Sequence, residues 1–153
     1  MISLQRAQQS HIKELVSNIS AMDEKEIYYA SGLNPFEGVK LCYTLSSADC
    51  EVALDSKNSV LSMHGVMPKE AYGIPWMILS KDAYKKEGIN HAMKVTVDWV
   101  DHKLQRYGKL QNFISVENKL TIKWLEFLGF QLKEKINKFG FCKQPFYKFE
   151  RSL

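Results

Sequence analysis

A cluster of cationic and small residues around Gly88 has the composition of an anion-binding turn. The stretch KDAYKKEGINHAMK, residues 81–94, follows the apolar run IPWMIL and continues into helical spacing. Backbone N–H groups at a helix N-terminus attract anions, Gly88 would let the backbone approach closely, and Lys85 and Lys86 would add positive charge. A single glycine is a weak motif, because the same residues also suit a plain loop before a helix. The turn from Lys85 to Asn90 is therefore a candidate phosphate site that needs support from elsewhere in the chain.

Length and composition describe one globular domain. The chain has 153 residues, 45% of them apolar and 25% charged, and it contains no low-complexity tract or flexible linker. A chain of this length can bury one sizeable core, so we expect a single ordered domain over residues 1–153. The apolar runs are too short to cross a bilayer, and the N-terminus turns polar too early for a signal peptide. The expected location is therefore the cytoplasm.

The cysteines and the net charge restrict the function classes. Cys42, Cys50 and Cys142 show no metal-type or CxxC spacing, and their odd number argues against a disulfide framework, so we expect reduced thiols and no metal site. The net charge of +4, from 21 basic and 17 acidic residues, suits a small anionic ligand or an acidic partner surface. It is too small to favour nucleic acid by itself. The lysine-rich tail QLKEKINKFGFCK keeps nucleic-acid binding as a third and weaker interpretation.

The first part of the chain is predicted to form a strand and two helices. Residues 2–8 alternate as a short strand, and Ser10 is expected to cap a helix that carries apolar residues at helical spacing up to Ile19. A second helix is predicted from Asp23 to a stop at Gly32. The following Asn-Pro pair, at positions 34 and 35, is expected to close it.

Four apolar segments follow and predict the centre of a sheet. Residues 39–46, 50–55 and 59–67 are rich in β-formers and are separated by turn clusters, which indicates two or three antiparallel strands. Residues 74–80, IPWMILS, form a nearly continuous apolar run of the kind that is buried on both faces of a sheet. Pro75 fits only near the start of such a strand.

The second half alternates between helix and strand. A long helix is predicted from Ile89 to a stop at Gly108, and residues 109–116 should form a strand parallel to residues 74–80, reached by a right-handed crossover. A short helix capped by Asn118 and two final strands within residues 131–152 complete the chain. The expected fold is α/β: a mixed, mostly antiparallel sheet with a central parallel pair and helices on both faces.

This order of elements resembles the GCN5-related N-acetyltransferase (GNAT) fold, and specific residues carry the resemblance. In that family the turn after the fourth strand reads Arg/Gln-x-x-Gly-x-Gly/Ala, which is matched here over residues 85–90 with Asn90 at the last small position. The family's segment Asn-x-x-Ala-Ile-x-x-Tyr-x-x-x-Gly-Phe is matched in spacing from Asn118 to Phe130. Leu125 occupies the tyrosine position of that segment.

The resemblance implies binding of acetyl-CoA, or coenzyme A, and transfer of an acetyl group to an amine acceptor. It implies that backbone groups of the fourth strand hold the pantetheine arm and the thioester oxygen, and that the turn holds the pyrophosphate. Asn118 would add a contact, although on its residue type alone it is a helix cap. The implied coenzyme-binding residues are Met77, Ile78, Leu79, Lys85, Lys86, Glu87, Gly88, Ile89, Asn90 and Asn118, with Trp76 on the same strand.

The acid, the base and the acceptor site are less defined. The family commonly uses a glutamate or a held water near the fourth strand as base, and Glu70 and His64 are the nearest candidates, although each also suits a purely structural role. Leu125 cannot donate a proton, so solvent would have to protonate the leaving thiolate. The resemblance places the first helices and the last strands beside the acceptor cleft, which makes candidates of Tyr28, Tyr29 and Tyr147.

A narrower resemblance suggests a second class of function. The stretches EIYYASGLNP, WMILSKDAYKK and TIKWLEFLGF are similar to the acetyltransferase-like internal virion protein A family of short-tailed bacteriophages, over about the last four-fifths of the chain. This resemblance implies a phage protein in the host cytoplasm. With Asn90 and Leu125 departing from the motif, it also implies an alternative: a noncatalytic virion-assembly or host-interaction protein with phage or host protein partners. The acceptor and the oligomeric state stay open.

Overall fold

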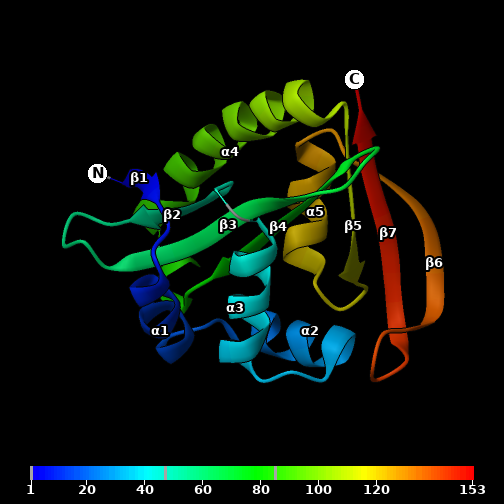
Figure 1. Cartoon of the computed structure of the whole chain (residues 1–153), viewed down its shortest axis with the longest axis horizontal. Helices are drawn as coiled ribbons and strands as arrows, with labels where there is room; N and C mark the ends of the chain where they lie inside the picture. The colour runs from blue at the N-terminus through cyan, green and yellow to red at the C-terminus, as the bar shows by residue number, and fades with distance from the viewer. Residues whose placement is uncertain (1, 47, 85) are drawn as a thin grey trace.

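The computed structural model describes residues 2–46, 48–84 and 86–153, and for residues 84 and 86–93 it describes the backbone alone. A single α/β domain results, in which helices flank a mixed sheet (Figure 1). In chain order the elements are β1 (Ser3–Arg6), α1 (Gln9–Ser17), α2 (Ala21–Ser31), α3 (Pro35–Ser46), β2 (Cys50–Leu54), β3 (Val60–Pro68), β4 (Gly73–Leu79), the 3-10 turn η1 (Lys81–Tyr84), α4 (Lys86–Tyr107), β5 (Lys109–Ser115), α5 (Lys119–Phe127), β6 (Gln131–Phe139) and β7 (Gln144–Ser152).

The described strands form one seven-stranded sheet in the order β1-β2-β3-β4-β5-β7-β6. β4 and β5 are its parallel pair and the other neighbours are antiparallel, as predicted for residues 74–80 and 109–116. Since parallel strands need a crossover connection, the chain between them forms α4, which crosses one face of the sheet (Figure 1). Parallel pairing at the sheet centre places the carboxyl ends of both strands at the same edge.

Two apolar cores lie on opposite faces of the sheet. One packs α1 and α3 against β2, β3 and β4, with Ile12, Leu15 and Val39 fully buried. The other packs α4 and α5 against β5 and β7, with Leu104 and Leu110 at its centre. Each fully buried aliphatic side chain contributes about 1.5–3 kcal/mol of transfer free energy. The two cores therefore fix the central strands from both sides.

The prediction of a strand at residues 39–46 was wrong, because this segment is the second half of α3. Asn34 and Pro35 do not close the preceding helix; they start this one. The Asn34 side chain accepts a hydrogen bond from the Glu37 N–H at 2.9 Å, and Pro35 occupies the first helical position, where its missing N–H costs nothing. Of the β-branched and aromatic residues that suggested a strand, Val39 is fully buried and Tyr43 is half-buried, whereas Thr44 is exposed.

Other boundaries shift by a few residues. The first helix begins after Gln8 rather than Ser10, and α4 begins at Lys86 rather than Ile89. Gly108 has a φ of +73°, which suits the predicted helix stop, and the chain reverses into β5 at this point. Among the described residues, no helix combines the length and the apolar composition that a bilayer span would require.

Candidate active site at the splayed β4–β5 pair

The parallel strands β4 and β5 touch at one end and diverge toward the other. Among the described residues their backbone register is limited to Gly73 opposite Leu110. Two residues further along each strand, a side-chain hydrogen bond takes the place of backbone pairing, because Asn112 Nδ2 donates to the Pro75 carbonyl at 2.7 Å. Beyond this bridge the strands separate toward their carboxyl ends and leave a gap between them. We call the open end of this gap, at the ends of β4 and β5, its mouth. Ligands of open α/β sheets bind in crevices of this kind.

The alternation of β4 decides which of its backbone groups face the gap. The Ser80 N–H donates to the Leu61 carbonyl, so even-numbered residues such as Ile78 direct their N–H and C=O toward β3. Pro75, Met77 and Leu79 therefore face the gap. Proline is tolerated within this strand because its missing N–H is on the unpaired side. Of the predicted pantetheine contacts, Ile78 has its backbone groups committed to β3.

The connection between α1 and α2 occupies the far end of the gap. Ile19 forms an isolated antiparallel bridge with Ser80, and the Ser20 N–H donates to the Leu79 carbonyl at 2.9 Å. The Leu79 N–H donates to the Asp23 carboxylate at 2.8 Å. Leu79 is therefore satisfied within the fold. Met77 lies between two occupied positions, and no ladder pair of the described residues involves its gap-facing N–H and C=O.

A second carboxylate on α2 reaches the end of β5. Glu26 accepts a hydrogen bond from the Ser115 N–H at 2.7 Å and from Asn118 Nδ2 at 2.9 Å. Asp23 and Glu26 are three residues apart, so they project from one face of α2. Helix α2 thus spans the mouth of the gap, with Asp23 bound to the end of β4 and Glu26 to the end of β5.

Burial changes the acidity of both carboxyl groups. It raises the pKa of Glu26 to about 7 and that of Asp23 to about 6, because removal from water disfavours the charged form. The hydrogen bonds from Ser115 and Leu79 oppose this effect without cancelling it, and the neighbouring Asp23 charge raises the pKa of Glu26 further. Two carboxyl groups that titrate near neutrality are therefore held at one end of the gap.

Substitution of Asp23 by Asn is expected to remove a pH-dependent loss of stability. In the wild type the folded-state pKa exceeds the ordinary value of about 3.9, so the resulting stabilisation is complete below pH 4 and is lost as the pH rises through 6. The loss is roughly 3 kcal/mol in the free energy of unfolding. An Asn oxygen can still accept from Leu79 and Ser20. In urea unfolding, the free energy of unfolding of Asp23→Asn relative to that of wild type should therefore be higher at pH 7.5 than at pH 4.5. The exposed Asp98→Asn should show no such trend, and a constant difference for Asp23→Asn would contradict the assignment.

A cavity of about 370 Å³ adjoins the gap and reaches both faces of the sheet. Most of its lining is apolar, and its polar lining includes Asp23, Glu26 and Asn112. Trp99, on α4, contributes an indole Nε1 that is buried without a hydrogen-bond partner among the described residues. The cavity falls within the size range of small-molecule sites and contains this buried donor, which no described residue pairs.

The two candidate bases predicted from the sequence, Glu70 and His64, have different environments in the structure. Glu70 is exposed in the turn between β3 and β4, at the closed end of the gap. His64 is buried in β3, packs edge-on against Trp99 with ring centroids 5.2 Å apart and lines the cavity. Burial, aided by the Lys103 charge, lowers the pKa of His64 to about 4. A neutral imidazole with so low a pKa is a weak base at physiological pH.

The predicted phosphate turn falls at the start of α4. Lys85 lies outside the described residues, and the side chains of Lys86, Glu87, Ile89 and Asn90 do as well. The backbone of residues 86–90 forms the first turn of the helix, so the predicted loop is helical over most of its length. The first N–H groups of any helix lack partners within the helix, which preserves the basis for an anion site here.

The remaining predicted residues take mostly structural positions. Asn118 caps α5, with its side-chain oxygen accepting from the Thr121 N–H at 3.4 Å, and its amide is used by Glu26. Leu125 is buried and lines the cavity. Tyr28 is half exposed and packs edge-on against Phe141, while Tyr147 packs into the core beneath α4 and α5.

The fold has counterparts among solved structures. A spermidine N-acetyltransferase from Vibrio cholerae, solved with CoA and spermine, matches with a TM-score of 0.71 at 11% identity, over 99% of this chain and 95% of that one. A GNAT-family acetyltransferase from Bacillus anthracis matches with a TM-score of 0.71 at 10% identity, over 99% and 94%. A GCN5-related N-acetyltransferase from Kribbella flavida matches with a TM-score of 0.65 at 15% identity, over 99% and 98%. The chain has the GNAT fold.

At these identities the likeness to GNAT structures establishes the fold alone. No family model and no curated protein sequence matches the chain significantly. Within the GNAT fold, the residues that sequence reasoning missed are Asp23 and Glu26, which resembled the solvated acidic residues of an amphipathic helix. Their spacing of three was a signal that they share a face, but the burial of that face depends on contacts with β4 and β5.

Proposed function

We propose that the chain is an acetyl-CoA-dependent N-acyltransferase. The observation that carries the proposal is the splayed β4–β5 pair, in which Met77 presents unpaired backbone groups to the gap while Glu26 closes its mouth. The GNAT fold supports the reaction class, and the buried carboxyl group supplies a base. With a pKa of about 7, Glu26 can exchange a proton at physiological pH.

The cavity suits the pantetheine arm of acetyl-CoA. This arm is largely apolar and carries amide groups, which need a few well-placed hydrogen-bonding partners. The Met77 C=O and the Trp99 Nε1, which has no partner among the described residues, can serve as such partners. The pyrophosphate would lie against the N-terminus of α4, where Lys85, Lys86 and the N–H groups from Glu87 to Asn90 remain our proposed contacts.

The residues at the gap have separate roles in the proposed reaction. When bound, acetyl-CoA supplies a thioester whose carbonyl carbon accepts the amine nitrogen and whose C–S bond breaks as the amide bond forms. Met77 N–H is placed to donate to the carbonyl oxygen as negative charge develops there. Glu26 takes the proton that the nitrogen loses. Because Leu125 cannot act as an acid, the sulfur takes its proton from solvent.

Substitution of Met77 by Pro tests the role of its backbone N–H. The change removes the donor on the gap side and leaves the pairing with β3 intact, as Pro75 already does two residues earlier. Loss of one hydrogen bond of about 1.4 kcal/mol should weaken acetyl-CoA binding about tenfold in isothermal titration. Met77→Ala, which keeps the N–H, is the matched control. Equal affinity of both variants, with wild-type thermal unfolding, would contradict the assignment.

A noncatalytic phage virion-assembly or host-interaction protein is the second candidate function. Two observations favour it: Leu125 fills the position where the GNAT family carries tyrosine, and the Asn118 amide is already bound to Glu26. A scaffold of this kind, in a host cytoplasm, would need neither acid nor coenzyme. Absence of CoA and acetyl-CoA binding at millimolar concentrations would favour it, whereas free-thiol release with any amine would rule it out.

A further inference from the structure

Three phenylalanine rings form a continuous stack on one face of the sheet. Phe139 of β6 lies between Phe113 of β5 and Phe146 of β7, with ring centroids 4.6 Å apart in both pairs. The interplanar angle is 27° for Phe113 and Phe139, which are stacked, and 38° for Phe139 and Phe146, which are tilted. Phe146 is fully buried, whereas Phe113 and Phe139 are partly accessible. The stack therefore presents ring surface that the fold does not cover.

The ring stack lies on the same side of the sheet as the α2 carboxylates. Leu110 and Ile114 of β5 pack into the core beneath α4 and α5, so Phe113, between them in the alternation, faces the opposite side. Helices α2 and α3 lie on this side, opposite α4 and α5, and β7 and β6 lie to the right of α2 and α3 in the view of Figure 1. The tip of the β6–β7 hairpin is tied to the end of α2, because the Phe141 and Cys142 N–H groups donate to the Ala30 and Tyr29 carbonyls.

All three rings and both carboxyl groups line the one cavity. Its opposite wall on α3 includes Leu41 and Cys42, which are apolar or weakly polar. Among the described lining residues, Asp23 and Glu26 are the only carboxylates, and there is no lysine or arginine. Each oxygen of Glu26 accepts one hydrogen bond from the fold, which leaves acceptor capacity for an amine.

This lining discriminates between kinds of amine. An acceptor with a single amino group can place it at Glu26 and its carbon skeleton against the rings. A polyamine would carry further ammonium groups into an apolar wall, where an unpaired charge is costly. A small hydroxylated amine would leave the ring surface in contact with water and gain little from burial.

We propose that the acceptor is a primary monoamine with an aromatic or similarly flat apolar group, whose ring packs on Phe139 and Phe113 while its nitrogen meets Glu26. This inference rests on the proposed N-acyltransferase function. It adds the acceptor class and assigns the ring stack as its specificity surface.

The test compares acceptors and variants in two assays. In the first, free-thiol release from acetyl-CoA is measured with 2-phenylethylamine, ethylamine and spermidine. In the second, binding of 2-phenylethylamine without coenzyme is followed by saturation-transfer NMR. We expect kcat/KM to be highest for 2-phenylethylamine. In Phe139→Ala it should fall about tenfold or more for that amine and less than twofold for ethylamine. Phe139→Leu, which keeps an apolar side chain, should show the same order of preference with a smaller loss.

Phe127→Ala is the matched control, because Phe127 is 63% exposed on α5 and lies outside the cavity lining. It should change neither assay. Higher kcat/KM for spermidine, or an unchanged preference in Phe139→Ala with wild-type thermal unfolding, would overturn the inference. Failure of the proposed function would look different: coenzyme would not bind and no amine would release thiol. In that case the binding role of the ring stack is tested by NMR alone. Equal binding of 2-phenylethylamine to wild type and Phe139→Ala would contradict that role.

Discussion

Replacement of Glu26 by Gln is expected to lower kcat for acetyl transfer by about 10²- to 10⁴-fold, the usual effect of removing a positioned general base. The substitution is nearly isosteric. A Gln oxygen can still accept from the Ser115 N–H, whereas the hydrogen bond from Asn118 Nδ2 to the second Glu26 oxygen is lost. What disappears is the group that takes the amine proton. The measurement is free-thiol release under saturating acetyl-CoA.

The pH dependence of kcat gives this prediction a second readout. In the wild type, burial raises the Glu26 pKa to about 7, so the carboxylate form is lost as the pH falls below that value. The wild-type kcat should therefore decrease about tenfold per pH unit below 7. The residual activity of Glu26→Gln should lack this limb. Asp23 is the other titratable group that faces Glu26. Because its pKa is about 6, Asp23 becomes protonated at a lower pH than Glu26.

Glu24→Gln provides the matched control, because Glu24 lies on the same helix with its side chain exposed. This variant should retain wild-type kcat and the same pH limb. Retention of more than a tenth of wild-type kcat by Glu26→Gln would exclude Glu26 as the base. CoA titration of the same variant separates lost chemistry from lost coenzyme binding, since Glu26 is not among the proposed coenzyme contacts.

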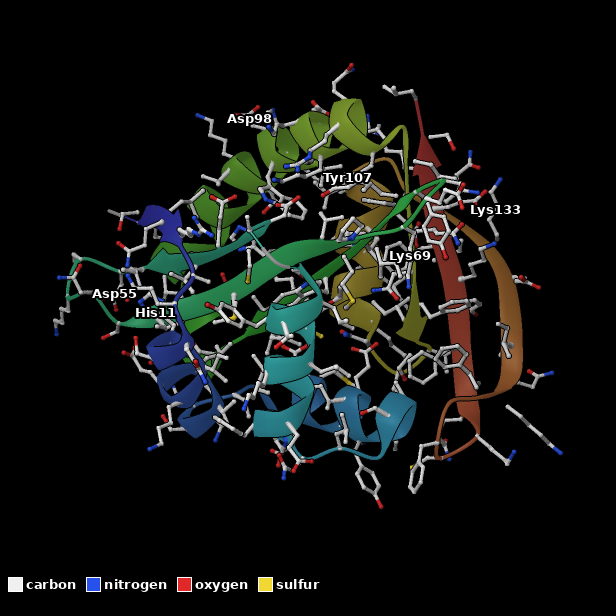
Figure 2. All side chains as sticks on the ribbon, in the orientation of Figure 1. His11, Asp55, Lys69, Asp98, Tyr107 and Lys133 are labelled. Carbon is white, nitrogen blue, oxygen red and sulfur yellow. The ribbon has the colours of Figure 1, made fainter. Side chains whose placement is uncertain are left out.

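Substitution of Asp49 by Ala is expected to lower the free energy of unfolding by about 3–5 kcal/mol, the usual cost of removing one partner of a buried ion pair. Asp49 precedes β2 and accepts from Lys103 Nζ at 2.5 Å and from the Tyr107 hydroxyl at 2.7 Å. The side chains of Asp49 and Lys103 are only 6% and 9% exposed. Figure 2 shows Tyr107 on the sheet side of α4 and Asp98 on its outer side. Removal of the carboxylate would leave the Lys103 ammonium buried without its partner.

A double substitution distinguishes a lost ion pair from a lost packing contact. Lys103→Met removes the stranded charge and keeps most of the side-chain volume, so Asp49→Ala with Lys103→Met should recover a large part of the stability lost by Asp49→Ala. The exposed pair between Asp101 and Arg151, at 3.3 Å, is the control, and Asp101→Ala should cost less than about 1 kcal/mol. Urea unfolding is measured for the wild type, Asp49→Ala, Lys103→Met, their double variant and Asp101→Ala. Additive effects of the two substitutions would contradict a coupled buried pair.

Local signals in the sequence predicted several features that the structure confirms. Gly108, with its positive φ, ends α4, and Asn118 caps α5, because both roles depend on the backbone conformation and polar groups of a few adjacent residues. Phe130 was expected to return to the core after Gly129, and it is 5% exposed. The failure at α3 was also local. Asn34, Pro35 and Glu37 form a helix start, but the β-branched and aromatic content of residues 39–46 outweighed that signal.

By itself, the sequence determined the order of most elements, the parallel pairing of residues 74–80 with 109–116 and the type of fold, because hydrophobic periodicity and turn chemistry act over short distances. The tertiary structure decided which groups meet at the gap. Glu26 and Ser115 are 89 residues apart, and Asp23 and Leu79 are 56 apart. The burial that raises the two carboxyl pKa values arises only when α2 lies across the ends of both strands. The base, the ring stack and the Met77 N–H acquire their proposed roles from that packing.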